Sequence, residues 1–139
     1  DPVKKVEQTL GIKMEPPQHK YDHTWSYYYR KNPEQYGDNY DIGYKPENDL
    51  TLIHVYGEYA TMEDWPVIEK VLKTLLPNGW KQVYDRALAE FSHGYQDAMD
   101  YESKQIYEYK VDGKLVKVKR WRGAKTEIKI YHKGYVPQD

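Results

Sequence analysis

Cysteine is absent from the 139 residues, which excludes a disulfide framework, thiol chemistry and cysteine-based zinc sites. No apolar run approaches the roughly 20 residues that a membrane-spanning helix needs. Phenylalanine occurs once, whereas tyrosine occurs 16 times and tryptophan four times. A tyrosine ring covers apolar surface while its hydroxyl needs a partner or water. We therefore expect half-buried sheet faces and hydrated aromatic surface.

Recognisable catalytic motifs are also missing. The sequence contains no GxSxG elbow, no Walker loop, no dinucleotide fingerprint and no HExxH zinc motif. Ser92 and His93 lie near Asp97, but adjacent helix residues point in different directions, so they do not form a nucleophile and its base. We therefore predict no catalytic residue and no cofactor, with a small hydrolase that lacks a recognisable motif as an alternative.

One short segment has the residue types of a metal site. His19, Asp22 and His23 lie within five residues, and histidines at i and i+4 can share a metal on a helix. Pro16 and Pro17 precede them and β-prone residues come after, which argues against a helix there. We therefore predict no metal site, and whether a third ligand comes from elsewhere stays open.

Charge is divided unevenly along the chain. Residues 103–139 contain ten Lys/Arg and four Asp/Glu, a charge of +6, whereas residues 1–102 contain 11 and 18, a charge of −7. The sum is the net charge of −1. Such asymmetry indicates either a surface that meets an anionic partner or two complementary faces that pair with each other.

The N-terminal segment reads as a short helix and then a stiff connector. Apolar residues at i, i+3 and i+7 predict a helix over residues 2–10, with Pro2 in its first turn and Gly11 at its end. Pro16-Pro17 forbids further helix. This segment either docks on the domain or tethers it.

Residues 21–60 are rich in tyrosine and β-prone. Trp25 to Tyr29 reads as a strand, and Tyr36 to Tyr40 as a turn, while Gly43 and Pro46 break the segment between that turn and residue 50. Leu50 to Tyr59 is nearly continuous in apolar and aromatic residues, which predicts a central strand contacted on both faces. His54 within it is interpreted as a packed strand residue.

Two helices are predicted next. An i, i+3, i+4, i+7, i+8 apolar stripe from Ile68 to Leu76 is typical of a core-facing helix, capped by Thr61 or Asp64. A second helix is predicted from about Gly79 to His93, with an extension to Tyr101.

The C-terminal third predicts a three-stranded meander. Asp112-Gly113 between alternating segments is typical of a two-residue type I′ hairpin, which pairs Tyr109 with Val116. For the second hairpin we prefer the three-residue loop Gly123-Ala124-Lys125, which places Val118 opposite Ile130.

Together these elements predict an α+β fold. We expect a single antiparallel sheet of about five to six strands, with two consecutive helices packed on one face and the meander at its C-terminal end. Residues 1–18 form the N-terminal helix and proline-rich lead, and residues 19–139 form the single α+β domain.

Exposed aromatic residues are the best candidates for a binding surface, since they offer large contact area at low entropy cost. We predict a non-catalytic binding or interaction module whose partner is a protein or a cell-surface polymer. The candidate binding residues are the aromatic ones of the tyrosine-rich region, Trp25, Tyr27, Tyr29, Tyr36 and Tyr40. Composition favours the processed extracellular part of a small bacterial surface protein or lipoprotein, and a cytoplasmic location remains an alternative.

The basic meander supports a second interpretation. In the derived register Lys117, Lys119 and Lys129 lie on its outer face together with Trp121. Lysines interleaved with aromatic rings can bind phosphates while bases or sugars stack, so a nucleic acid or a cell-wall polymer is an alternative ligand. A plain solvated face, with lysine protecting against edge-to-edge aggregation, explains the same pattern.

Overall fold

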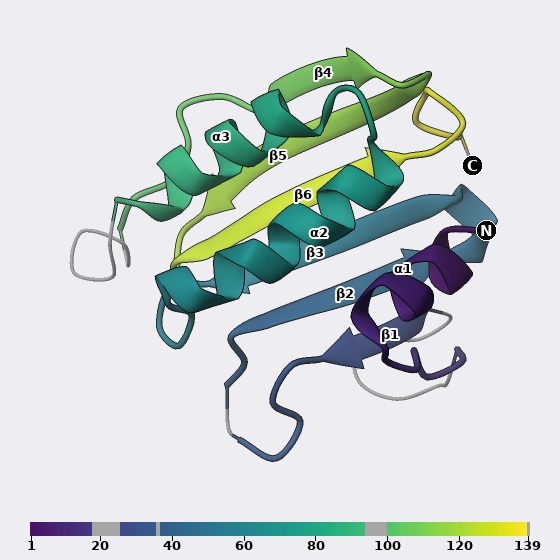
Figure 1. Ribbon diagram of the computed structural model, residues 1–139. Helices are drawn as coiled ribbons and strands as arrows, with labels where there is room; N and C mark the ends of the chain where they lie inside the picture. Colours follow the sequence, from purple (N-terminus) through teal and green to yellow (C-terminus); the bar gives the residue numbers. More distant parts are fainter. Residues whose placement is uncertain (18–25, 36, 94–99, 139) are drawn as a thin grey trace.

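The computed structural model describes residues 1–17, 26–35, 37–93 and 100–138. Within these residues, three helices cover one face of a six-stranded antiparallel sheet whose strand order is β1-β2-β3-β6-β5-β4 (Figure 1). This arrangement confirms the predicted α+β fold. The elements are α1 (Pro2–Leu10), β1 (Tyr27–Arg30), β2 (Tyr40–Lys45), β3 (Leu50–Tyr56), α2 (Trp65–Leu75), α3 (Trp80–Phe91), β4 (Tyr107–Val111), β5 (Lys114–Trp121) and β6 (Lys125–Tyr131).

The core lies between the helices and the sheet. The predicted stripe of α2, including Ile68 and Leu72, is fully buried and packs in one cluster with Val116, Val118 and Ile130 of the meander. Helix α2 comes after a short 3-10 turn, Met62–Asp64, in which Thr61 and Asp64 form a capping box. The opposite face of the sheet carries no helix in the described part of the chain (Figure 1).

The N-terminal helix docks on the domain. Asp1 caps α1, Gly11 ends it in a left-handed conformation, and Val6 is buried in the common core. The hydroxyl groups of Thr9 and Thr74 lie 2.9 Å apart, which ties α1 to α2. Of the two alternatives for this segment, the structure therefore shows docking.

Strand β2 was not predicted, because Gly43 and Pro46 were interpreted as breakers. Tyr40 begins the strand instead of ending a turn, and Gly43 pairs with Tyr28 on one side and Leu52 on the other. A glycine inside a strand weakens its local preference, but neighbours on both sides supply the missing order. Tertiary pairing overrides the local signal here.

Strand β3 is central in the sheet, as predicted, but ends at Tyr56 rather than Tyr59. The alternate residues Ile53 and Val55 are fully buried toward the helices, whereas His54 and Tyr56 are only half-buried on the other face. The prediction of a strand contacted on both faces holds only in part, since in the described part of the chain neighbouring side chains, and not a second layer, cover the far side.

The two hairpins of the meander differ in how well their register was predicted. Tyr109 pairs with Val116 as expected around Asp112-Gly113. In the second hairpin Val118 pairs with Ile128 rather than Ile130, because the three-residue loop is 122–124. Ala124 is fully buried, and its backbone has a left-handed conformation. Its carbonyl accepts a hydrogen bond from the backbone N–H of Gly57 at 2.7 Å. This contact shifts the loop by one residue, and since the pairing shifts by two, every side chain keeps its predicted face.

Helix α3 ends at Phe91 against a buried arginine. The guanidinium of Arg120, fully buried, donates to the carbonyl oxygens of Glu90 and Phe91 at 2.8 and 3.1 Å. A cation at the C-terminus of a helix satisfies its free carbonyls and complements its dipole. The predicted helix from Gly79 to His93 thus stops slightly early. Of its extension, residues 94–99 lie outside the described residues and Tyr101 is not helical.

Asp112 joins the first hairpin to the start of α3. Its carboxylate accepts hydrogen bonds from the backbone N–H groups of Gly79 and Asn78, at 2.8 and 3.2 Å, and from the Asn78 side-chain amide at 2.8 Å. Its backbone is left-handed, with φ of 53°. One residue therefore serves the type I′ turn through its backbone and the N-terminus of α3 through its side chain.

We predict that Asp112→Ala lowers the free energy of unfolding by about 1–3 kcal/mol, through the lost helix-start hydrogen bonds and an alanine in a left-handed turn. Asp112→Asn keeps an acceptor oxygen and tolerates that turn, so it should lose less than half as much. Urea unfolding monitored by circular dichroism measures both. Equal losses in the two variants would contradict the capping role.

Candidate functional site

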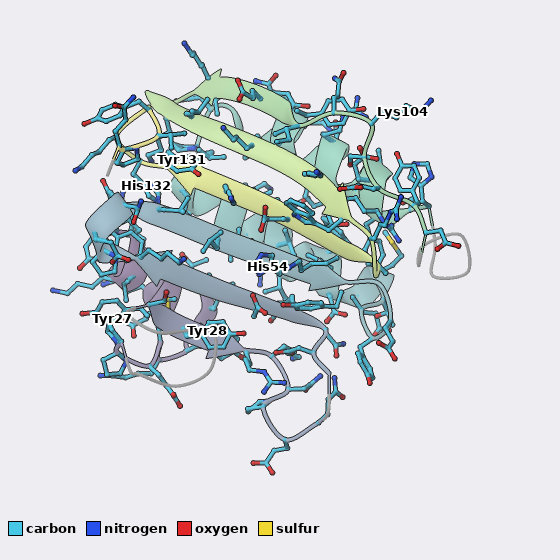
Figure 2. All side chains as sticks on the ribbon, turned by 180° about the vertical axis from the view of Figure 1, so that it is seen from behind. Tyr27, Tyr28, His54, Lys104, Tyr131 and His132 are labelled. Atoms are coloured by element: carbon cyan, nitrogen blue, oxygen red, sulfur yellow. The ribbon has the colours of Figure 1, made fainter. Side chains whose placement is uncertain are left out.

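The face of the sheet that points away from the helices, called the open face below, carries the candidate site (Figure 2). Alternate residues of each strand point to it, so its composition is set by strand register. Figure 2 looks onto this face and shows His54 near the middle of the sheet. Around it lie charged and aromatic side chains from β1, β2, β3, β6 and β5.

His54 lies between two carboxylates in a row that crosses three neighbouring strands. Asp41 of β2 and Glu127 of β6 are its direct cross-strand partners. Its Nδ1 lies 3.0 Å from Oδ1 of Asp41, and its Nε2 lies 2.9 Å from Oε2 of Glu127. A carboxylate only accepts, so this geometry favours the cationic imidazole, in which both ring nitrogens donate.

The pKa values of the row result from this geometry. Burial opposes the charge on His54, but the hydrogen bonds to Asp41 and Glu127 outweigh it and raise the pKa above the ordinary 6.5. Burial also opposes the charge on Glu127, yet the imidazolium beside it lowers the pKa of that carboxyl to about 2. Each charge is thus held by its neighbours, because oppositely charged partners within hydrogen-bond distance favour the ionised form.

Two tyrosines complete the cluster. The hydroxyl groups of Tyr28 and Tyr56 donate to Oδ2 of Asp41 at 2.9 and 2.6 Å. Burial, and after it the charge of Asp41, raises the pKa of both phenols above the ordinary value of 10.0. These five residues, Asp41, His54, Glu127, Tyr28 and Tyr56, are called the His54 cluster below.

A depression of about 320 Å³ lies over the cluster. Gly43 contributes no side chain to the row between Tyr28 and Leu52, which leaves this part of the open face low. A Cβ added at Gly43 would meet its nearest atom only at 3.6 Å, an ordinary contact, so space is available above the glycine. The lining, called the Gly43 depression below, comprises Ser26, Tyr28, Asp41, Gly43, Lys45, Leu52, His54, Tyr56, Lys125, Glu127 and Lys129.

Lysines surround the depression. Lys129 lies 3.9 Å from the carboxylate of Glu127. Lys45 and Lys125 have no ion-pair or hydrogen-bond partner within the described ranges. In the strand register Lys45 pairs with Leu50 and Lys125 with Tyr56, at the two ends of β3. Two lysines that are unpaired among the described residues therefore flank the depression.

Of the residues predicted to bind a partner, Tyr27, Tyr29 and Tyr40 lie on the other side of the sheet. Tyr40 is 3% exposed and belongs to the core, so its ring is not available to a ligand. Tyr27 and Tyr29 are half-buried and pack against that core. Tyr27 also lines a second cavity of about 600 Å³ between α1 and the ends of β1 and β2. Trp25 and Tyr36 lie outside the described residues.

The predicted basic residues all lie on the open face, each beside an acidic partner. Lys117 lies 3.4 Å from Glu108, and Lys119 lies 3.0 Å from Glu102. Lys119 also stands 3.9 Å over the ring of Trp121, whose indole N–H donates to Glu127 at 3.2 Å. The structure therefore brings these residues together, but acidic neighbours offset much of their charge.

The candidate metal ligands His19, Asp22 and His23 lie outside the described residues. Within the part of the chain that the structure describes, no group of three histidines or acidic residues is placed to hold a metal ion. No described helix has the length and apolar character needed to span a membrane.

Sequence reasoning missed the His54 cluster. Its members come from four strands, one of which, β2, was interpreted as a broken segment. The pairing of β3 with β6 joins residues about 73 positions apart, and no local pattern reports it. The only local signal is that His54 alternates with buried residues in β3, which places it on the face opposite the helices.

Comparison with known protein families, with curated proteins and with solved structures finds no match to this chain.

The cluster predicts a pH-dependent stability. His54→Gln should lower the free energy of unfolding by about 2–4 kcal/mol, since it leaves two carboxylates without their cation. The raised pKa of His54 means that its contribution is complete below pH 6.5 and is lost as the pH rises through the folded value. The lowered pKa of Glu127 means that its contribution is complete above pH 4.5 and is lost toward pH 2. The difference from wild type is therefore largest between pH 4.5 and 6.5.

Chemical unfolding at several pH values tests this expectation. His93→Gln is the matched control, because the His93 side chain is 42% exposed and its only charged partner among the described residues, Glu90, lies 3.7 Å away. Because the His93 ring also stacks on Tyr101 at a centroid distance of 3.8 Å, we expect that variant to lose about 1 kcal/mol or less. A His54→Gln loss that is the same at pH 5.5 and pH 9 would contradict an ionic role for His54.

Proposed function

We propose that this chain is a non-catalytic binding module that holds an anionic ligand in the Gly43 depression. The observation that carries the proposal is the space left by the missing side chain at Gly43. This space lies above a polar cluster whose own groups are paired with one another. It also lies between Lys45 and Lys125, which have no partners among the described residues. Such a concave site with rigid walls and a few charged groups at its rim is typical of ligand binding.

The hydrogen bonding of the cluster favours binding over catalysis. Both nitrogens of His54 lie within hydrogen-bond distance of carboxylates, and in the cationic ring that this geometry favours neither has a lone pair with which to accept a proton. The hydroxyl protons of Tyr28 and Tyr56 are likewise committed to Asp41. The groups that chemistry would use are therefore occupied in holding one another in place.

The same bonds make the site rigid. Because both phenols are tied to one carboxylate oxygen, the rings of Tyr28 and Tyr56 are fixed as walls of the depression. Walls that are already ordered lose little conformational entropy when a ligand arrives. The cluster thus supports the binding surface without itself contacting charge on the ligand.

The lining indicates the ligand chemistry. Lys45 and Lys125 offer ammonium groups at opposite ends, and Lys129 adds a third at the side. The tyrosine rings and Leu52 offer apolar surface between them. A ligand that combines a ring with carboxylate, sulfate or phosphate groups, such as an acidic oligosaccharide, matches both features.

We predict that Gly43→Leu fills the depression and weakens binding at least about tenfold, while Gly43→Ala, which adds a Cβ in open space, changes it less than about threefold. The probes are a uronic-acid oligosaccharide, an aromatic carboxylate and inorganic phosphate, titrated at about 50 mM salt and monitored by NMR. Thermal unfolding checks that both variants stay folded.

Charge is tested separately. Replacing Lys45 and Lys125 together with glutamate should abolish binding of the ring-bearing anions. Glutamate at the exposed residues Lys104 and Lys133 makes the same change in net charge away from the depression and should leave binding intact. If no probe binds the wild type at low salt, where charge interactions are strongest, the proposal is wrong. Equal loss in both double variants would indicate a nonspecific charge effect.

The extracellular location predicted from composition is part of the same proposal. The tyrosine and lysine content and the lack of cysteine support it. We expect the gene to encode a secretion signal or a lipid-attachment signal upstream of Asp1. The genomic sequence upstream of the codon for Asp1 provides the test. A gene without such a signal would contradict the expectation.

A further inference from the structure

The two edge strands of the sheet, β1 and β4, differ in whether another segment pairs with their outer side. At one end Glu15 bridges to Tyr28, and the two residues exchange backbone hydrogen bonds of 2.9 Å that cover part of β1. At the other end β4 closes the sheet, and no described strand pairs with its outer side. It lies along one border of the sheet in Figure 1. An open edge of this kind is a template for pairing with another chain.

The hairpin determines which groups point outward from β4. A two-residue turn closes on a pair of residues that exchange both backbone hydrogen bonds, here Val111 and Lys114. Val111, Tyr109 and Tyr107 therefore direct their N–H and C=O groups toward β5. Glu108 and Lys110 direct theirs to the outside, where each presents one donor and one acceptor.

These outward groups limit the ways in which two copies of β4 can pair. In an antiparallel two-fold pair, outward residues must meet outward residues. Centring the pair on Glu108 places glutamate opposite glutamate, and centring it on Lys110 places lysine opposite lysine. Centring it on Tyr109 places Glu108 of each copy opposite Lys110 of the other, so four backbone hydrogen bonds coincide with two opposite-charge pairs.

We propose that two copies of this chain associate through β4 in the register centred on Tyr109, joining their sheets into one. Glu108 and Lys110 are exposed on the open face, and Lys117 beside Glu108 extends the charge alternation into β5. On the helix side Tyr109 meets its own copy as a non-hydrogen-bonded pair, where facing side chains lie closest. Arg86, 4.0 Å from the ring of Tyr107, borders that contact.

The area available is small, because β4 has only five residues. We expect the buried area to fall below the about 1,200 Å² of a typical stable interface. We therefore expect a weak dimer, with a dissociation constant between about 10 μM and 1 mM. Such a dimer would place two Gly43 depressions on one continuous open face, which favours ligands with repeated anionic groups. The dimer itself rests only on β4 and not on the proposed binding function.

Charge reversal tests the register directly. Glu108→Lys places lysine opposite lysine in both pairs, and Lys110→Glu places glutamate opposite glutamate, so each single variant should be monomeric up to about 1 mM. A one-to-one mixture restores opposite charges across the axis and should associate. The double variant Glu108→Lys with Lys110→Glu should also associate, as strongly as wild type within about threefold. Sedimentation equilibrium from about 10 μM to 1 mM measures each case.

A second measurement needs no variant. With rising concentration of the wild type, amide hydrogen exchange should slow at Glu108 and Lys110, while Tyr107 and Tyr109, already bonded to β5, should change little. Thermal unfolding of the Glu108→Lys variant checks for the lost pair with Lys117. A wild type that stays monomeric at 1 mM overturns the proposal. So do single variants that associate like wild type, or a mixture of folded single variants that does not associate.

Discussion

The ionic row of Asp41, His54 and Glu127 is the constraint on which the open face depends. Two carboxylates on the same face of β2 and β6, the two strands that flank β3, would repel each other and lose hydration. The imidazolium between them removes both costs, because it donates one hydrogen bond of about 3 Å to each. The row also joins β2, β3 and β6, so it links the N-terminal and C-terminal halves of the sheet across its centre.

The ionic row also holds the proposed binding surface in place. Asp41 fixes the rings of Tyr28 and Tyr56, and these rings form walls around the space left by Gly43. A sheet face without a covering layer is usually a problem of exposed apolar surface. Here charged pairs and tethered phenols make the centre of the face polar, a small apolar cluster of Leu50, Leu115 and Tyr131 lies beside them, and one concave region is left. Architecture and candidate function thus have the same physical origin.

The sequence predicts the layers of this fold better than its site. Periodicity identified the α2 stripe from Ile68 to Leu76, and Asp112-Gly113 predicted the first meander hairpin residue by residue. These features depend on neighbours within a few positions. The second hairpin was displaced because the buried contact of Ala124 with Gly57 comes from a distant part of the chain. Strand β2 was missed for the same reason, since its stability comes from partners on both sides of Gly43.

The candidate site lay outside what local patterns report. Exposed tyrosines were the predicted recognition surface, but the strand parity that puts Tyr28 on the open face puts Tyr27 and Tyr29 on the helix side. The face to which a strand residue points could be assigned only once the strand register was known. The β3–β6 pairing that brings Glu127 to His54 joins two strands that have α2 and α3 between them in the sequence. Residues far apart in sequence therefore determine the site.

The most direct test is the protonation state of His54, measured by nitrogen NMR of its imidazole ring. At pH 6.5 an ordinary histidine is about half protonated. We expect His54 at that pH to be predominantly the cation, with protons on both Nδ1 and Nε2 and both in hydrogen bonds. A mainly neutral ring with one unprotonated nitrogen would contradict the ionic row and, with it, the basis assigned to the open face.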